Sequence, residues 1–536
     1  MLFRRTFFVA LALVLFTAMQ LNAQSITQGN VRGTVTDPTG AVVPGAKVTL
    51  KNISTGAAQT RTTNGSGFYE FALLPPGTYS VAVSAPNYAA ATQTVSVAVG
   101  QVSTNNVKLA VAASSQTVEV VANGSVLQAN PQVSTTMSQQ QIEYVPNGAG
   151  DLSYVAQTAP GASMNTQGGY GNFSTFGLGG TTNNFTVNSA PENDPFLGLN
   201  NSGATNVLLG QNDVGEATVV NNGYSGQYFS SGANVNYVSK SGTNNFHGNA
   251  IWYWNGRAMN ANNYFNKQNS PATPRGFVND NQWAASVGGP IKKNKSFFFV
   301  DTEGLRVMVP VSRTINLPTP AFQNAVLANV GTMQPSEVPL YQNMFNFWNG
   351  APGAASATNS LPGGGCQDFT NPNFGASNPC ALQLHSTVST LTHEWLLTGR
   401  FDQNFSDNDK MFIHYRTDHG LQATYTDPLN PIFNATSNQP QDEGQVQWTH
   451  TAGANIVNSF TVNGSHYSTL FGYPNQSATL AAQPVEVSFA GGALYGIGHD
   501  YNVFPQGRNV TQYGFVDDMN WTLGRNSVKF GGNFSR

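Results

Sequence analysis

The chain has 536 residues, of which only 9% are charged, and its formal net charge is −3. Ordinary soluble domains carry about 25% charged residues, so this composition does not suit a cytoplasmic enzyme, and the weak net charge gives no sign of a nucleic-acid partner. Glycine, asparagine, serine, threonine and aromatic residues take the place of the charges, which is typical of β-proteins whose faces meet lipid or a polar lumen.

The N-terminus has the pattern of a secretory signal peptide. Arg4 and Arg5 form a positive segment, residues 7–16 are an apolar run, and the small residue Ala23 ends a suitable cleavage site. The apolar run is shorter than the about 20 residues that a membrane-spanning helix needs, which favours cleavage over an anchor helix. We therefore expect residues 1–23 to be a signal peptide and the protein to be exported.

Residues 28–110 alternate short apolar and polar runs with turn sequences, such as those at residues 37–40 and 64–67. This pattern predicts a small antiparallel β-sandwich. The segments 33–50, 64–71 and 74–79 resemble the carboxypeptidase regulatory-like domain. The resemblance implies a transthyretin-like sandwich, related to carbohydrate-binding-like folds. It implies no peptidase activity here, because the unit has no histidine that could bind zinc.

Residues 111–124 form a linker. One segment in it resembles the short box that TonB-dependent receptors offer to their periplasmic energising partner, which would bind it by adding a strand to a sheet edge. The alternative is a plain strand or linker segment. The box candidate consists of Thr117, Val118, Glu119, Val120 and Val121.

Residues 125–245 are rich in glycine, asparagine and serine and contain few long apolar runs. Three segments resemble the plug domain of Oar-like TonB-dependent receptors, namely residues 145–161, 177–188 and, with the greatest specificity, 234–248. We therefore interpret this unit as a plug domain.

Two positions depart from the plug pattern of that family. Gly179 stands where the family usually has arginine, and Asn188 stands where it usually has aspartate. We expect the loss of both charges to weaken any ion pair that holds the plug to the lumen wall.

Residues 246–536 show the alternation that a transmembrane β-barrel requires, with one face apolar for lipid and the other polar for the lumen. In the hairpin around Ser406-Asp407-Asn408-Asp409, aromatic and aliphatic side chains alternate with polar ones on both strands. This pattern predicts the first part of an antiparallel barrel. The lumen-facing candidates are Arg400, Asp402, Asn404, His414 and Arg416.

Two long segments, 306–392 and 421–442, have a loop-like composition. Loops of this length are uncommon in soluble domains but usual on the outer side of outer-membrane barrels. Cys366 and Cys380 both lie in the first segment. In an exported chain we expect them to form a disulfide that braces an extracellular loop, and two free thiols are the alternative.

The strand patterns number about eight to ten, whereas plugged transporters have about 22 strands. Residues 527–536 have the pattern of mid-strand residues. We therefore expect the chain to be part of a longer receptor. The alternative is a complete small barrel, which could not enclose a plug of this size.

The sequence offers no motif for catalysis. His393-Glu394 begins a metalloprotease-like pattern, but Leu397 occupies the place of the second histidine. Glycine-rich nucleotide loops and nucleophile elbows are also missing. We predict no enzymatic activity, no metal and no cofactor.

The predicted fold is all-β: a transthyretin-like sandwich, a plug domain and a partial transmembrane barrel. The resemblance implies a TonB-dependent outer-membrane receptor that takes up a ligand, either a small molecule such as a siderophore, a glycan or a peptide. Its expected partners are a TonB-type periplasmic protein and outer-membrane lipid. Two alternatives remain: an outer-membrane adhesin or carbohydrate-binding surface protein without transport, and a secreted β-rich hydrolase, for which the sequence shows no catalytic pair.

Overall fold

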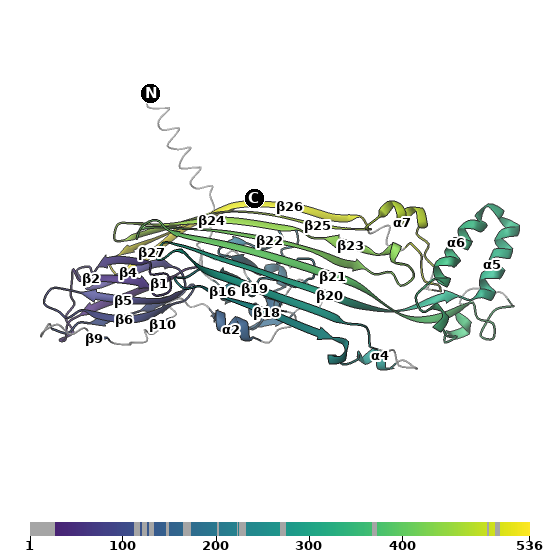
Figure 1. The fold of residues 1–536 in the computed structure, drawn as a ribbon, viewed down its shortest axis with the longest axis horizontal. Coiled ribbons are helices and arrows are strands. Elements are labelled where there is room, and N and C mark those ends of the chain that lie inside the picture. The colour runs from purple at the N-terminus through teal and green to yellow at the C-terminus, as the bar shows by residue number, and fades with distance from the viewer. Residues whose placement is uncertain are drawn as a thin grey trace, which may run out of the picture.

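The computed structural model shows an elongated molecule with a sandwich at one end, a long sheet, and helices at the other end (Figure 1). It describes residues 27–111, 118–119, 126–127, 133–145, 150–164, 173–200, 203–221, 223, 232–268, 275–366, 372–489, 493–498 and 504–536. The predicted signal peptide lies outside these residues. Of the described helices, none combines the length and apolar composition needed to cross a membrane.

Two packed sheets form the N-terminal sandwich. One has the order β10-β7-β1-β4 with β8 beside β1, and the other has the order β3-β2-β5-β6-β9. Their bounds are β1 (Gly29–Thr36), β2 (Lys47–Asn52), β3 (Ala58–Thr62), β4 (Phe68–Leu74), β5 (Gly77–Ser84), β6 (Ala91–Val97), β7 (Val102–Thr104), β8 (Val107–Lys108), β9 (Val118–Glu119) and β10 (Val126–Leu127). Alternate side chains of these strands meet in one core, which includes Val31, Val35, Val48, Leu50, Phe71 and Val81. Burying each such side chain contributes about 1.5–3 kcal/mol.

The plug has a mixed sheet with the order β11-β16-β17-β14-β15. Its elements are β11 (Val133–Ser138), α2 (Gln139–Tyr144), α3 (Ser153–Gln157), β12 (Ala162–Met164), β13 (Phe173–Thr175), η1 (Gly180–Thr182), β14 (Asn184–Val187), β15 (Ala190–Pro191), β16 (Val214–Asn221) and β17 (Asn234–Ser239). The helices α2 and α3 pack on this sheet, and the apolar core of the plug contains plug residues alone. The plug is therefore stabilised from within.

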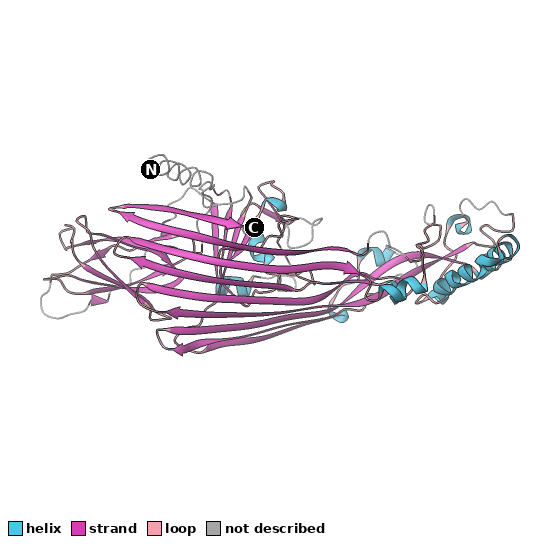
Figure 2. Ribbon diagram, turned by 90° about the horizontal axis from the view of Figure 1, so that it is seen from above, coloured by secondary structure: helices cyan, strands magenta, loops and turns pink. Residues whose placement is uncertain are grey.

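The third unit is a ten-stranded antiparallel sheet whose long strands lie side by side along the molecule (Figure 2). Its strands are β18 (His247–Gly256), β19 (Asn279–Lys292), β20 (Ser296–Pro318), β21 (Ala381–Asn404), β22 (Asp409–Tyr425), β23 (Ala435–Asn438), β24 (Gln441–Ala452), β25 (Ile456–Gly472), β26 (Gln506–Leu523) and β27 (Asn526–Ser535). Along β22, Ile413 and Tyr415 are 41% and 49% exposed, whereas His414 and Arg416 are 2% and 5% exposed. A sheet that buries its charged side chains and exposes its apolar ones suits a lipid environment. The predicted all-β fold class is confirmed.

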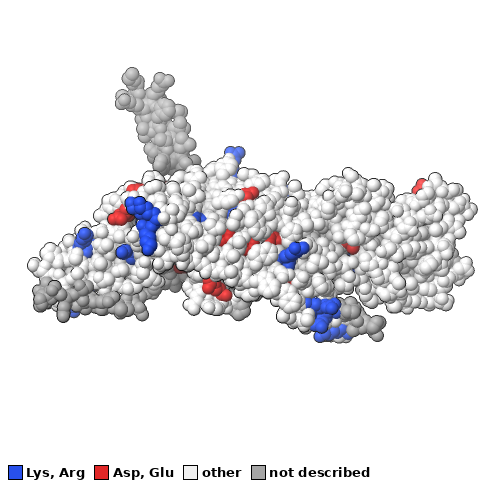
Figure 3. All heavy atoms as spheres, viewed as in Figure 1, with Lys and Arg blue, Asp and Glu red and all other residues white. Residues whose placement is uncertain are grey.

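The surface of the sheet agrees with this arrangement. In Figure 3 the visible face over the barrel strands and over the terminal helices carries few charged side chains. Outward-facing apolar residues along the strands include Val300, Trp395, Val446, Trp448, Phe460, Phe515, Phe530 and Phe534.

The two ends of the sheet differ. Turns of a few residues join the strands at the sandwich end, whereas the opposite end carries long connections with helices (Figure 1). The sandwich lies at the end of the sheet with the short turns, which in outer-membrane barrels is the periplasmic end. The remaining helices are η2 (Arg257–Met259), α4 (Tyr264–Gln268), α5 (Pro320–Met333), η3 (Pro335–Glu337), α6 (Val338–Asn349), η4 (Ala354–Ser356), η5 (Pro362–Gly365), η6 (Pro431–Phe433) and α7 (Gln476–Ala482).

The prediction that residues 306–392 and 421–442 are loops is wrong in part. Strand β20 continues to Pro318, β21 begins at Ala381, and α5 and α6 lie between them, while β22 continues to Tyr425 and β23 follows. The helix α5 begins at the N-cap Thr319, whose hydroxyl accepts the backbone N–H of Phe322. The side chain of Trp348 from α6 is buried against the strand ends in a separate apolar core, and this packing stabilises the helical region.

Candidate functional site at the plug and barrel interface

Glu394 on β21 points from the barrel wall to the plug. Its carboxylate oxygen Oε2 accepts hydrogen bonds from the backbone N–H of Thr205 at 2.6 Å and from the Thr205 hydroxyl at 2.5 Å. The side chain is 1% exposed. Because one carboxyl oxygen accepts two hydrogen bonds from the same residue, Glu394 holds this plug segment at Thr205.

Glu303 and Asp301 on β20 hold the same plug segment further along. They are two residues apart, so both project from the inner face of the strand. Glu303 accepts the backbone N–H of Gly210 at 3.0 Å and that of Asn212 at 2.6 Å. Asp301 accepts the side-chain amide of Asn212 at 2.6 Å. Three carboxylates of the wall therefore bind plug residues 205–212.

Two of the lumen-facing candidates, Arg416 and His414, contact the plug from β22. Arg416 Nη2 donates to the carbonyl of Leu209 at 3.3 Å, and Nη1 lies 3.8 Å from a Glu192 carboxylate oxygen. His414 Nε2 lies 3.5 Å from a carboxylate oxygen of Asp213. Both side chains are buried against the plug, where the alternation had placed them.

The ion pair between Arg416 and Glu192 is weak. Burial raises the pKa of Glu192 well above its usual value, and the neighbouring Glu443 raises that pKa further, while the Arg416 charge opposes both. At 3.8 Å the two groups lack the close geometry of a strong charged hydrogen bond. The hydrogen bond of Arg416 to the plug backbone is the firmer contact.

Arg400 connects the wall to the plug near the end that carries the sandwich. Its guanidinium donates to both oxygens of Asp402, at 2.9 to 3.2 Å, and donates to the Ser239 hydroxyl at 2.9 Å. It also lies over the ring of Phe412, 4.1 Å from the ring centroid. Asp402 and Asn404 line a cavity at this end. All five lumen-facing candidates therefore lie on the inner side of the sheet.

The two departures from the plug pattern have different surroundings. Asn188 is buried, and its side chain both donates to the Ser239 hydroxyl and accepts the Ser239 N–H. Asn188 and Ser189 form the two-residue turn between β14 and β15 with φ of 47° and 75°, a conformation that asparagine adopts more readily than most residues. Gly179 has open space around it. The amide of Asn188 thus takes part in the contact that Arg400 makes through Ser239.

One close ion pair between plug and wall was missed in the sequence. Asp194 of the plug pairs with Arg508 of β26, and the Arg508 guanidinium also lies near the rings of Phe196 and Tyr467. Alternation along β26 could have placed Arg508 on the inner face. Its partner is 314 residues away in the sequence and lies in a plug segment without a periodic pattern.

The box candidate is only partly within the described residues. Thr117, Val120 and Val121 lie outside them, and Val118–Glu119 form β9. This strand pairs in parallel with Ala91 and Thr92 at the edge of the sandwich.

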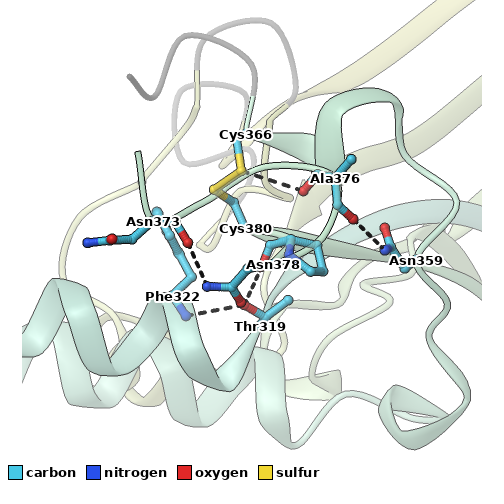
Figure 4. The surroundings of a disulfide bond; sticks show 10 residues. Thr319, Phe322, Asn359, Cys366, Asn373, Ala376, Asn378 and Cys380 are labelled. Carbon is cyan, nitrogen blue, oxygen red and sulfur yellow. Dashed lines mark hydrogen bonds between the residues drawn. A yellow bond between two sulfur atoms is a disulfide. The ribbon is translucent and has the colours of Figure 1, made fainter. Parts of the chain in front are cut away.

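The cysteines lie at the other end of the molecule. Cys366 and Cys380 form a disulfide with a Cα–Cα distance of 5.0 Å (Figure 4). Close to it, Thr319 donates its backbone N–H to the carbonyl of Cys380 at 2.9 Å and its hydroxyl to that of Pro379 at 2.7 Å. The disulfide thus lies where the start of α5 meets the start of β21.

Comparison with known proteins agrees with this arrangement. Residues 238–536 match the family described as an outer membrane beta barrel domain, and residues 30–110 match the carboxypeptidase regulatory-like domain. Because the first match covers more than half of the chain, the protein belongs to the outer membrane β-barrel domain family. The predictions of an outer-membrane location, of an N-terminal regulatory-like domain and of an Oar-like relationship are confirmed.

Individual relatives are more distant. The TonB-dependent transporter Oar of Myxococcus xanthus is 27% identical over 282 residues, which are 50% of this chain and 26% of Oar. The outer membrane transporter YddB of Escherichia coli has a TM-score of 0.46 at 11% identity, covering 74% of this chain and 47% of YddB. A mutant ferric enterobactin receptor, PfeA of Pseudomonas aeruginosa, has a TM-score of 0.43 at 10% identity, covering 76% and 49%. The chain spans about a quarter of Oar and about half of these solved structures.

Proposed function

We propose that the protein moves a ligand across the outer membrane, and that a TonB-type periplasmic protein supplies the energy by acting on the linker. The observation that carries this proposal is the nature of the plug contacts. The plug closes its apolar core within itself, whereas Glu303, Glu394 and Arg416 of the wall bind it through hydrogen bonds.

This division makes the plug separable from the wall. A hydrogen bond that is exchanged for water changes the free energy by only about 0.5–1.5 kcal/mol, or about 1.5–3 kcal/mol when one group is charged. An apolar interface of the same size would instead resist wetting. A force on the linker can therefore displace the plug while its own fold persists.

The orientation of the molecule supports transport over adhesion. The sandwich and β9 lie at the end with short turns, on the periplasmic side, where a periplasmic protein can reach the box candidate. The helical region around α5 and α6 lies at the outer end, where a ligand arrives. An adhesin would be expected to present its sandwich to the outside instead.

The ligand class follows less directly. A small molecule such as a siderophore, a glycan and a peptide all fit a lumen lined by carboxylates, amides and hydroxyls. The resemblance of the sandwich to carbohydrate-binding-like folds favours a glycan.

The test is the substitution Val118→Pro in the box candidate. Proline removes the backbone N–H and restricts the backbone, so it blocks strand addition to the partner. Uptake of a panel of labelled siderophores, oligosaccharides and peptides would be measured in cells with and without the TonB-type partner. We expect V118P to lower the uptake of the transported class to the level of partner-deficient cells, while binding of that ligand to the cell surface is unchanged.

The control is Val118→Thr, which keeps the N–H and the β-branched shape and should retain uptake. Undiminished uptake in V118P cells and in partner-deficient cells would contradict the proposal. Ligand binding to the cells without any uptake in wild type would favour the adhesin alternative.

A further inference from the structure

A cavity of about 260 Å³ lies where the sandwich, the plug and the barrel wall meet. The sandwich contributes Gln28 and Gln59, the plug contributes Asn188, and the wall contributes Arg400 and Lys410. The strands of the barrel wall that line the cavity are β20, β21, β22 and β24, and each of them pairs with a neighbouring strand on both sides. The cavity is therefore walled by paired strands and does not lie at an open sheet edge.

The two cations of the wall differ in their partners. Arg400 is neutralised by the two oxygens of Asp402. Lys410 lines the cavity, and within the described part of the chain its ammonium has no hydrogen-bond or ion-pair partner. Asp407 attracts it from beyond ion-pair distance, and the charge of Arg61 repels it. Lys410 thus presents an unneutralised positive charge to the cavity.

Arg61 is the corresponding group on the sandwich. It follows Gln59 on the same face of β3, is 7% exposed, and has no partner for its Nε atom. Its Nη1 makes only a long contact of 3.4 Å to the Thr60 carbonyl, and its guanidinium lies 5.7 Å from the centroid of the Phe71 ring. Loss of water lowers the pKa of Arg61, and no carboxylate opposes that effect.

Arg61 lies two residues beyond the lining residue Gln59, and its charge repels that of Lys410, so two cations without carboxylate partners lie near each other at the junction. Burying the charge of Arg61 without a partner is costly, and its repulsion of the Lys410 charge adds to this cost. A negative group between them would remove both costs. The amide groups of Gln28 and Gln59 each have a buried oxygen without a partner among the described residues, and a rotated amide can turn its NH₂ group to an anion instead.

We propose that this cavity is a binding site for an oxyanion, a phosphate or carboxylate group, bound by Lys410 of the barrel wall and attracted by the nearby charge of Arg61 of the sandwich. Guanidinium and ammonium groups are the usual partners of such anions in proteins. Because the two cations belong to different units, the bound anion fastens the sandwich to the periplasmic mouth of the barrel. The site does not depend on the identity of the transported ligand.

The test is anion binding by the full chain in detergent, measured by calorimetry with inorganic phosphate and with citrate at constant ionic strength in chloride. We expect saturable binding of at least one of the two anions. Arg61→Gln and Lys410→Gln should each weaken it by about tenfold or more, because each removes a positive charge near the bound anion.

The matched control is Lys529→Gln. Lys529 also faces this mouth of the barrel, but the carboxylates Glu70 and Asp518 lie near it, so its loss should change anion affinity by less than about twofold. Binding of phosphate alone would define a phosphate site and binding of citrate alone a carboxylate site.

A second measurement guards against misfolding of a variant. Phosphate or citrate should raise the melting temperature of the wild type but not that of R61Q or K410Q, and without these anions neither variant should melt below the wild type, because each loses an unpaired charge. The proposal is overturned if neither anion binds saturably, if chloride binds equally well, or if K529Q loses as much affinity as K410Q.

Discussion

Glu303 reaches the plug with both carboxylate oxygens, and each oxygen has one backbone N–H as its donor. Glutamine has the same shape but only one oxygen, so its NH₂ group would face a donor. We expect Glu303→Gln to weaken the attachment of the plug by about 1–3 kcal/mol. The backbone N–H groups of Gly210 and Asn212 should then exchange with deuterium about tenfold faster or more, as measured by mass spectrometry of this plug segment.

Asp442→Asn is the control for this prediction. Asp442 accepts the Tyr415 hydroxyl at 2.8 Å on the outward face of the sheet, so its substitution should leave exchange in the plug unchanged. Equal exchange in E303Q and wild type would show that Glu303 does not hold the plug.

Residues on the inner face were predictable in position but not in partner. The period of two along a strand placed Arg400, His414 and Arg416 toward the lumen, because a half-buried strand must separate its polar from its apolar side chains. The same period places Glu303 and Glu394 there. Their partners lie 91 and 189 residues away, in a plug segment without alternation, so only the folded structure brings them together.

At the scale of elements, strands were easier to predict than helices. The barrel strands carry their own signal, because lipid outside and water inside impose alternation on each of them. The helices α5 and α6 lie in a stretch whose glycine, proline and asparagine residues suggested a loop. They fold because apolar side chains such as Phe345 and Trp348 pack on the strand ends Ile315 and Leu384, which is a tertiary contact that no local pattern reports.

The junction between β16 of the plug and the sandwich contains a titratable group. Glu216 accepts the backbone N–H of Val99 at 2.5 Å. Burial raises the pKa of Glu216 from 4.5 to about 7, and this hydrogen bond only partly opposes the rise. Because the folded-state pKa exceeds that of the unfolded chain, the stability contribution is full below about pH 4.5 and is lost as the pH rises through about 7.

This shift predicts a pH dependence that one substitution removes. Across pH 4.5 to 7 the wild type should lose about 3 kcal/mol of unfolding free energy relative to Glu216→Gln, since each pKa unit corresponds to about 1.4 kcal/mol. The measurement is denaturant unfolding of both proteins in detergent over this pH range. Parallel pH profiles would show that Glu216 is not protonated in the folded state.

At the scale of the whole molecule, the sandwich is attached to the barrel as well as to the plug. The hydroxyl of Thr522 donates to Glu70 at 3.0 Å, and the Asn64 amide donates to the Gly524 carbonyl at 3.2 Å. Ala72 and Leu73 of β4 also pack on Val457 of β25. These contacts hold the sandwich at the short-turn mouth of the barrel sheet, by which a transported ligand would leave under the proposed function.

If the ligand leaves by that mouth, fixing the sandwich there should stop transport. Glu70→Cys combined with Thr522→Cys replaces a hydrogen-bonded pair by two thiols that a short, reducible bifunctional thiol reagent can join. We expect uptake to fall toward the level of partner-deficient cells once the crosslink has formed and to recover on reduction, while surface binding persists. Each single cysteine variant, treated in the same way, controls for reduction of the Cys366–Cys380 disulfide. Unchanged uptake with the crosslink complete would mean that the ligand passes the sandwich without displacing it. The barrel wall and the plug alone would then form the path of the ligand.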